Sequence, residues 1–325
     1  MNIEKNLDVI NACRFCFMCR HLDPVGNVTF RESDTPRGRA LISDKIRMDN
    51  AFLNNADFVE TMYRSALSAA NRYHCVSHYD ETGLVLAARM DIVDAGFAPE
   101  RVKLLAGKLG KTVFTVKGKG ETLYYGDNPG LYPKCKTIAG RDPGKALEVL
   151  GFAAESKEVF ERFKSAVVDS GCKTLVVAEP SAYDFLKGKL DGVKVVHCSE
   201  YLLSMKFKAG PARRASYLES DFLKNYRDNM PVPRKLLKKC GYELVPFGTN
   251  GEESYSVGEG AVVYDDLNPE LCEKMCQHVY EMADDVTKDL FITASRYVKN
   301  TLKKYNSKFE IITIEEAAAK KRTKK

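Results

Sequence analysis

The sequence predicts an α+β protein of several domains, with a helical N-terminal region followed by two similar α/β lobes. Apolar residues recur at helical spacing from residue 1 to about 105, as in AFLNNADFVETMYRSALSAANRYH. Beyond this region, β-rich runs such as ETLYYG, TLVVAE, YELVPF and FEIITI alternate with helical stretches. That alternation is typical of parallel sheets with helices packed on their faces.

The two lobes are expected because one pattern occurs twice. TLVVAEPSAYDFLKGKLDGVKVVHCSEYL, from Thr174, aligns with DLFITASRYVKNTLKKYNSKFEIITIEEA, from Asp289. Each segment reads strand, turn, helix, strand and an acidic helix start. The stretch KAGPARRAS, near residues 208 to 216, is a plausible joint. We therefore expect domains at 1–105, 106–212 and 213–318, and a basic disordered tail at 319–325.

The net charge of +6 comes largely from the C-terminus, where KKRTKK carries five positive charges. The rest of the chain sums to about +1 (6 − 5), so we expect no nucleic acid binding. The tail leaves a peripheral contact with an acidic membrane surface open. No apolar run is long enough to cross a bilayer, and the N-terminus lacks the pattern of a signal peptide, so a cytoplasmic location is expected.

Three of the ten cysteines cluster in CRFCFMCRHLDP, where Cys13, Cys16 and Cys19 are each two residues apart. Without an export signal the cysteines should be reduced thiols, and clustering then indicates metal chemistry. This spacing lets one loop fold three sulfurs around a [4Fe-4S] cluster, which needs a fourth ligand. Asp23 stands before Pro24, where a CxxCxxCxxxCP run has its last cysteine.

A second run explains the missing ligand. Ser65, Ser68, Asn71 and Cys75 repeat the spacing of Cys13, Cys16, Cys19 and Asp23, but only the last position is a cysteine. In two-cluster ferredoxins the last cysteine of each run binds the cluster of the other run. The sequence therefore predicts one cluster on Cys13, Cys16, Cys19 and Cys75, and a second position that has lost every thiol.

Two other ligand sets stay open. Asp23 is expected to be a capping or solvated carboxylate, although direct ligation through its oxygen is an alternative. The other ligand set is a structural zinc site made of the three N-terminal cysteines with His21, His74 or Cys75.

The chain resembles the iron-sulfur subunit family of glycolate oxidase, anaerobic glycerol-3-phosphate dehydrogenase and heterodisulfide reductase. The resemblance rests on CxxCxxC, on TPRGRALI at residues 35 to 42, and on VLAARMDIVDAGFAP after the second run. It implies a helical ferredoxin-like domain and two CCG-type α/β lobes. It also implies that Arg37 and Arg39 place positive charge near the cluster.

The two lobes resemble those of this family in their sequence pattern but lack its cysteines. Residues at the positions of the family's lobe cysteines are Glu179, Ala182, Asp221, Tyr255, Ser256, Ser295 and Val298. Lobes without thiolates cannot build the extra cluster that cleaves disulfides, so we expect that activity to be absent.

The resemblance implies a non-catalytic electron-transfer subunit with one [4Fe-4S] cluster. Its partner would be a dehydrogenase subunit for a 2-hydroxy acid or a similar alcohol, with FAD on that subunit and not on this chain. Two alternatives stay open: a scaffold subunit with a structural or sensory cluster, and a stand-alone enzyme using the cleft between the lobes.

Overall fold

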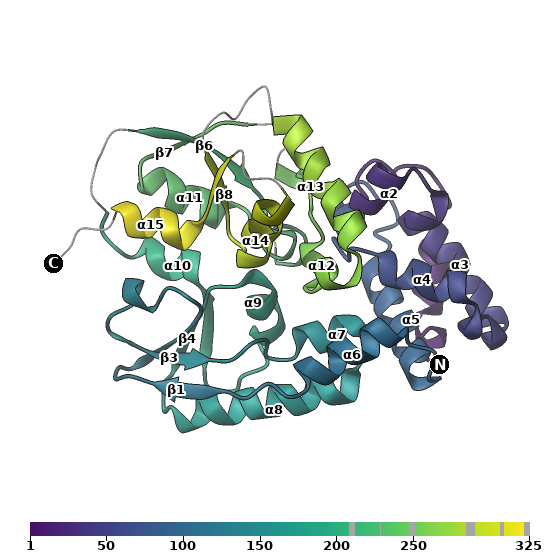
Figure 1. Ribbon diagram of the computed structural model, residues 1–325, viewed down its shortest axis with the longest axis horizontal. Helices are drawn as coiled ribbons and strands as arrows, with labels where there is room; N and C mark the ends of the chain where they lie inside the picture. The colour runs from purple at the N-terminus through teal and green to yellow at the C-terminus, as the bar shows by residue number, and fades with distance from the viewer. Residues whose placement is uncertain (208–211, 228, 247–250, 284–289, 306–308, 322–325) are drawn as a thin grey trace.

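A region of helices lies beside two mostly parallel β-sheets in the computed structural model (Figure 1). The structure describes the chain except residues 208–211, 228, 247–250, 284–289, 306–308 and 322–325. The protein is thus a mixed α/β protein, as predicted. The expected joint near residues 208 to 216 lies partly outside the described residues, and it is wrong for residues 213 to 216, which lie in a strand of the second sheet.

The helical region runs from the N-terminus to Leu109 and lies on the right in Figure 1. Its α-helices are α1 (Leu7–Ala12), α2 (Pro24–Thr29), α3 (Pro36–Met48), α4 (Ala56–Arg64), α5 (Glu81–Asp94) and α6 (Glu100–Leu109). Short 3-10 turns, η1 (Glu4–Asn6), η2 (Glu32–Asp34), η3 (Asn50–Asn54) and η4 (Ala70–Tyr73), lie between them. Helix α6 passes the boundary expected at residue 105.

The first lobe contains a five-stranded sheet in the order β1-β3-β2-β4-β5. Its strands are β1 (Thr115–Lys117), β2 (Thr122–Tyr125), β3 (Cys135–Ala139), β4 (Thr174–Val177) and β5 (Lys194–His197). Only β1 pairs antiparallel, with β3. The helices are α7 (Lys145–Leu150), α8 (Ala153–Asp169), α9 (Pro180–Leu186) and α10 (Cys198–Leu203), and η5 (Pro129–Leu131) precedes β3.

The second lobe contains a parallel sheet in the order β7-β6-β8-β9. Its strands are β6 (Arg213–Leu218), β7 (Tyr242–Leu244), β8 (Leu290–Thr293) and β9 (Glu310–Thr313). Its helices are α11 (Pro231–Lys239), α12 (Tyr264–Leu267), α13 (Pro269–Ala283), α14 (Arg296–Tyr305) and α15 (Ile314–Lys321). A π-helical turn, η6 (Phe222–Tyr226), and the 3-10 turns η7 (Gly251–Glu253) and η8 (Glu259–Ala261) complete it.

The predicted repeat is confirmed in its order of elements. The segment β4-α9-β5-α10 of the first lobe corresponds to β8-α14-β9-α15 of the second. Helix α15 continues to Lys321, which lies inside the expected tail, and residues 322–325 lie outside the described part of the chain. This helix also joins the lobes, because Glu315 accepts hydrogen bonds from Tyr132 (2.6 Å) and Asn128 (3.1 Å).

The helical region docks on the second lobe through the segment that carries the second run. Asn225 Nδ2 and Tyr226 Oη of η6 donate to the carbonyls of Ser68 and Leu67, each at 2.5 Å. Gly260 packs on the same loop, and a Cβ added to it would lie 1.9 Å from the Leu67 carbonyl oxygen. The backbone of residues 67–68 is therefore held by the second lobe.

All ten cysteines are free thiols, as predicted, and Cys272 and Cys276 are buried within α13. Among the described helices, none combines the length and apolar character needed to span a bilayer.

Gly260→Ala should destabilise the protein by about 1–3 kcal/mol, because the added methyl group meets the backbone of Leu67 and not a movable side chain. Gly107→Ala, in α6, is the matched control, since no atom lies within 4 Å of its added Cβ. Gly107→Ala should raise the free energy of unfolding by up to about 1 kcal/mol, because alanine favours the helix more than glycine does. Guanidinium unfolding midpoints measure both. Equal midpoints for wild type and Gly260→Ala would contradict the close packing of these segments.

Candidate metal centre

The first cysteine run forms an irregular loop between α1 and α2. Cys13, Cys16 and Cys19 are half-buried in it. Phe15 adopts a left-handed conformation, with φ of 52°, which is uncommon outside glycine. This conformation turns the chain sharply between Cys13 and Cys16.

Cys75, far along the chain, approaches the same loop. It follows η4, and its amide donates to the Asn71 carbonyl at 2.9 Å. Burial raises the pKa of Cys13, and the nearby Cys75 and Cys16 thiols raise it further. Cys19 also interacts with Cys13 electrostatically, and burial raises the pKa of Cys19 to about 11. The Cys16, Cys19 and Cys75 thiols thus lie close enough to Cys13 to interact with it electrostatically.

Backbone amides point at three of the four sulfurs. The Tyr79 amide donates to Cys75 Sγ at 3.4 Å. The amides of Phe15 and Arg37 likewise bond the sulfurs of Cys13 and Cys19 and oppose the rise in their pKa that burial causes. Such donors favour the thiolate form that a metal requires.

Arg37 holds the cysteine loop in place. It lies in the first turn of α3, so its amide is free to bond Cys19 instead of a helical carbonyl. Its guanidinium donates to the Phe15 carbonyl at 2.9 Å and lies 4.1 Å above the Phe17 ring. Glu32 pairs with the same guanidinium at 2.6 Å. Arg37 therefore lies beside the cysteine loop, as the resemblance implies.

The second run keeps the backbone of the first without its sulfurs. Leu67, two residues after Ser65, is left-handed with φ of 49°, as Phe15 is two residues after Cys13. The Leu67 amide donates to Ser65 Oγ at 3.3 Å, just as the Phe15 amide bonds the Cys13 sulfur. The two runs therefore share a local fold, and only one of them presents thiols.

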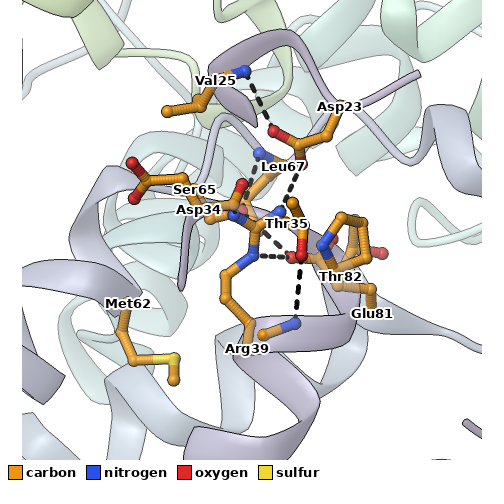
Figure 2. Close-up of polar contacts among 12 residues, drawn as sticks. Asp23, Val25, Asp34, Thr35, Arg39, Met62, Ser65, Leu67, Glu81 and Thr82 are labelled. Carbon is orange, nitrogen blue, oxygen red and sulfur yellow. Dashed lines mark hydrogen bonds and ion pairs between the residues drawn. The ribbon is translucent and has the colours of Figure 1, made fainter. Parts of the chain in front are cut away.

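Arg39 joins the end of the first run to this second run (Figure 2). Its guanidinium pairs with Asp23 and, at 2.5 Å, with Glu81, and all three side chains are buried. Ser65 Oγ donates to Glu81 at 3.3 Å, while the Asp34 carbonyl accepts from Arg39 at 2.6 Å. Ion pairs thus occupy the surroundings of Asp23 and Ser65, two of the four positions predicted to have lost a cluster.

The charges in this network are not balanced, since two carboxylates share one guanidinium. Burial raises the pKa of Glu81, and Arg39 only partly opposes that rise. Burial alone would lower the pKa of Arg39, but Asp23 and Glu81 raise it overall, so Arg39 stays charged.

Asp23 itself is a capping residue, as expected. Its Oδ1 accepts from the amides of Val25 (2.9 Å) and Gly26 (2.7 Å) at the start of α2, and its Oδ2 pairs with Arg39. Both oxygens are engaged by protein donors, so direct metal ligation would compete with the helix cap or with the Arg39 ion pair. Sequence reasoning did not find Glu81, because nothing in DETGLV marks this carboxylate as buried.

Four of the lobe positions that the resemblance aligns with cysteines meet in two pairs. Ser295 Oγ donates to Glu179 at 2.5 Å, which links α14 to α9 across the lobes. Ser256 Oγ donates to Asp221 at 2.6 Å. Tyr255 instead packs edge-on against His278, and Ala182 and Val298 are buried apolar residues. Hydrogen bonds thus connect these positions without thiols.

Comparisons of the chain with models of protein families, with curated proteins and with solved structures found no match.

Arg39→Met should destabilise the protein by about 3–5 kcal/mol at pH 8, because it leaves two buried carboxylates unpaired. Without Arg39, burial would hold the pKa of Glu81 above that of the unfolded chain. Glu81 then binds a proton more tightly in the folded state, so the loss of stability should shrink as the pH falls toward 5.

Arg47→Met, on the same helix, is the matched control, since its pair with Asp44 is about one-third exposed. We expect it to cost under about 1 kcal/mol at every pH. Urea unfolding between pH 5 and 8 measures both variants. If the loss of unfolding free energy in Arg39→Met did not change with pH, the result would contradict the buried network.

Proposed function

We propose that this chain is an electron-transfer subunit that holds one [4Fe-4S] cluster on Cys13, Cys16, Cys19 and Cys75. A cluster bound there supplies one-electron transfer with little atomic movement. The observation that supports this most is that the segment of Cys75 contacts the first run, where the His21 and His74 ring centroids lie 5.0 Å apart. The corresponding positions Asp23 and Ser65 instead lie in an ion-pair network. This is the ligand exchange expected between two ferredoxin-type runs.

The spacing of the thiols supports a cluster over a single zinc ion. Thiolates on one zinc lie about 3.8 Å apart, because each Zn–S bond is about 2.3 Å long. In the described part of the chain, the one group of three or more potential ligand atoms within 4.8 Å of one another contains no cysteine. A [4Fe-4S] cluster binds each thiolate on a different iron atom, so it fits sulfur atoms that lie farther apart than those on one zinc ion.

The hydrogen bonds and the positive charge around the thiols suit a cluster that is reduced and reoxidised. Amides of Phe15, Arg37 and Tyr79 bond three sulfurs, and the Arg37 guanidinium adds a positive charge beside them. Hydrogen bonds and positive charge stabilise the more negative, reduced form and raise the reduction potential. This favours a centre that accepts electrons over one that is only structural.

An apolar rim around the cysteine loop supports exchange with a protein partner. Phe15, Phe17, Met18 and Val76 are 45%, 66%, 46% and 75% exposed. Such a concentration of exposed apolar side chains marks an interaction surface. Arg14 and Arg20 are exposed in the same loop, so a partner with carboxylates around an apolar centre would fit.

The proposed partner is an FAD-dependent dehydrogenase subunit for a 2-hydroxy acid or a similar alcohol, with the flavin on that subunit. The resemblance to the iron-sulfur subunit family supplies this partner. It also supplies the finer description of the fold, a ferredoxin-like domain with two degenerate CCG-type lobes. The Glu179–Ser295 and Asp221–Ser256 pairs are consistent with lobes that carry no cluster.

Cys75→Ala should lose the cluster, because it removes one of four thiolates. Anaerobically purified wild type should contain about four irons per chain and give an EPR signal on reduction. Cys135→Ala is the matched control, since Cys135 is a buried cysteine of strand β3. Asp23→Asn keeps a side-chain oxygen at the start of α2 and leaves Arg39 paired with Glu81, so it should also keep the iron. Loss of the iron there with an unchanged unfolding midpoint would indicate that Asp23 is a ligand.

Met18→Gln should slow reduction of the cluster by the co-purifying flavoprotein and its substrate about tenfold, equivalent to about 1.4 kcal/mol of docking energy. The substitution adds no charge beside the cluster, so the reduction potential and the iron content should not change. Met282→Gln, at another half-exposed methionine, in α13, should reduce at the wild-type rate. Stopped-flow absorption measures the rate, and equal rates in all three proteins would exclude the rim as the docking surface.

A further inference from the structure

We propose that His21, His74 and Glu253 form a second metal site, which binds one divalent transition-metal ion of the zinc class. The His21 and His74 rings meet edge-on with centroids 5.0 Å apart. His74 Nε2 lies 2.9 Å from Glu253 Oε1. One ligand atom from each residue lies within 4.8 Å of the others, a convergence that no other His, Cys, Asp or Glu group in the described residues shows.

The ligand types match the proposed ion. Two imidazole nitrogens and one carboxylate oxygen are a frequent ligand set for zinc in sites that keep a coordination position open. Ligand atoms on one tetrahedral zinc lie about 3.4 Å apart, since the bonds are about 2.0–2.2 Å long. Closing from 4.8 Å therefore requires side-chain adjustments of about 1 Å. The carboxylate also offsets part of the ion's charge.

The three ligands come from three segments that the fold brings together. His21 follows Cys19 by two residues, His74 directly precedes Cys75, and Glu253 ends the turn η7 of the second lobe. The His74 amide is held by the Asn71 carbonyl at 3.3 Å. An ion bound here would tie both cysteine-bearing segments to the second lobe while leaving the cysteine sulfurs free.

The site is accessible and has space beside it. His21 is exposed, and the side chains of His74 and Glu253 are 29% and 40% exposed, so an ion can enter from solvent. His21 and Glu253 also line a pocket of about 330 Å³ together with Ser256 and His278. The pocket gives room for a water molecule or a small anion as the remaining ligand.

The test uses the complete, cluster-loaded chain and Zn²⁺ alone. The protein is incubated anaerobically with Zn²⁺, free ion is removed, and zinc and iron are measured by mass spectrometry. We expect about one zinc per chain with the iron content unchanged. In crystals, anomalous scattering measured on both sides of the zinc edge should place that zinc between the two imidazoles and the Glu253 carboxylate.

His21→Asn and Glu253→Gln should each lose the zinc and keep the iron. His78→Asn is the matched control, because His78 is exposed in the same loop and its φ of 49° is one that asparagine tolerates. It should bind zinc as the wild type does. Zinc retained in Glu253→Gln, zinc found on the cysteines, or no bound zinc would each overturn the proposal.

These outcomes are independent of the proposed electron transfer. A chain that binds zinc at the histidines but holds no iron would overturn the proposed function and leave the second site standing. A chain that holds its cluster but binds no zinc would overturn the second site and leave the proposed function standing.

Discussion

The buried ion pairs of Arg39 are the interaction on which the arrangement of the cysteines depends. Arg39 binds Asp23, four residues after Cys19, and Glu81, six residues after Cys75. The two cysteine-bearing segments are thereby fixed relative to each other by protein contacts alone. Buried ion pairs add little net stability, because desolvation offsets the attraction between the charges. The value of this network therefore lies in its geometry, which holds Cys75 against the first run.

The two runs show that one backbone can support different chemistry. Phe15 and Leu67 share a left-handed conformation, and in each run an amide two residues on bonds the first side chain. The first run presents thiols, which can bind iron. In the second run Ser65 instead donates a hydrogen bond to the buried Glu81. The single cluster that we propose could not pass electrons along a series of clusters within the protein. Under that proposal a partner would have to come close to it, and the apolar rim is where we expect that contact.

The sequence was most informative where spacing alone carries the chemistry. The matched spacing of the two runs predicted that the segment of Cys75 lies beside the first run, and the repeat predicted the matching order of elements in the two lobes. Strands β3 and β6 were not predicted, since CKTIA and RRASYL mix polar with apolar residues and lack a clear period. The separate environments of Arg37 and Arg39 depend on which face of α3 each occupies, and the burial of Glu81 depends on Arg39. Contacts between distant segments decide such features, and local patterns do not record them.

The most direct test of the account is a crystal structure of the anaerobically purified protein with iron located by its anomalous scattering. We expect one cluster of iron atoms bonded to the sulfurs of Cys13, Cys16, Cys19 and Cys75, with Arg39 still between Asp23 and Glu81. A second iron centre beside Ser65, or a single metal atom on the cysteines, would contradict it.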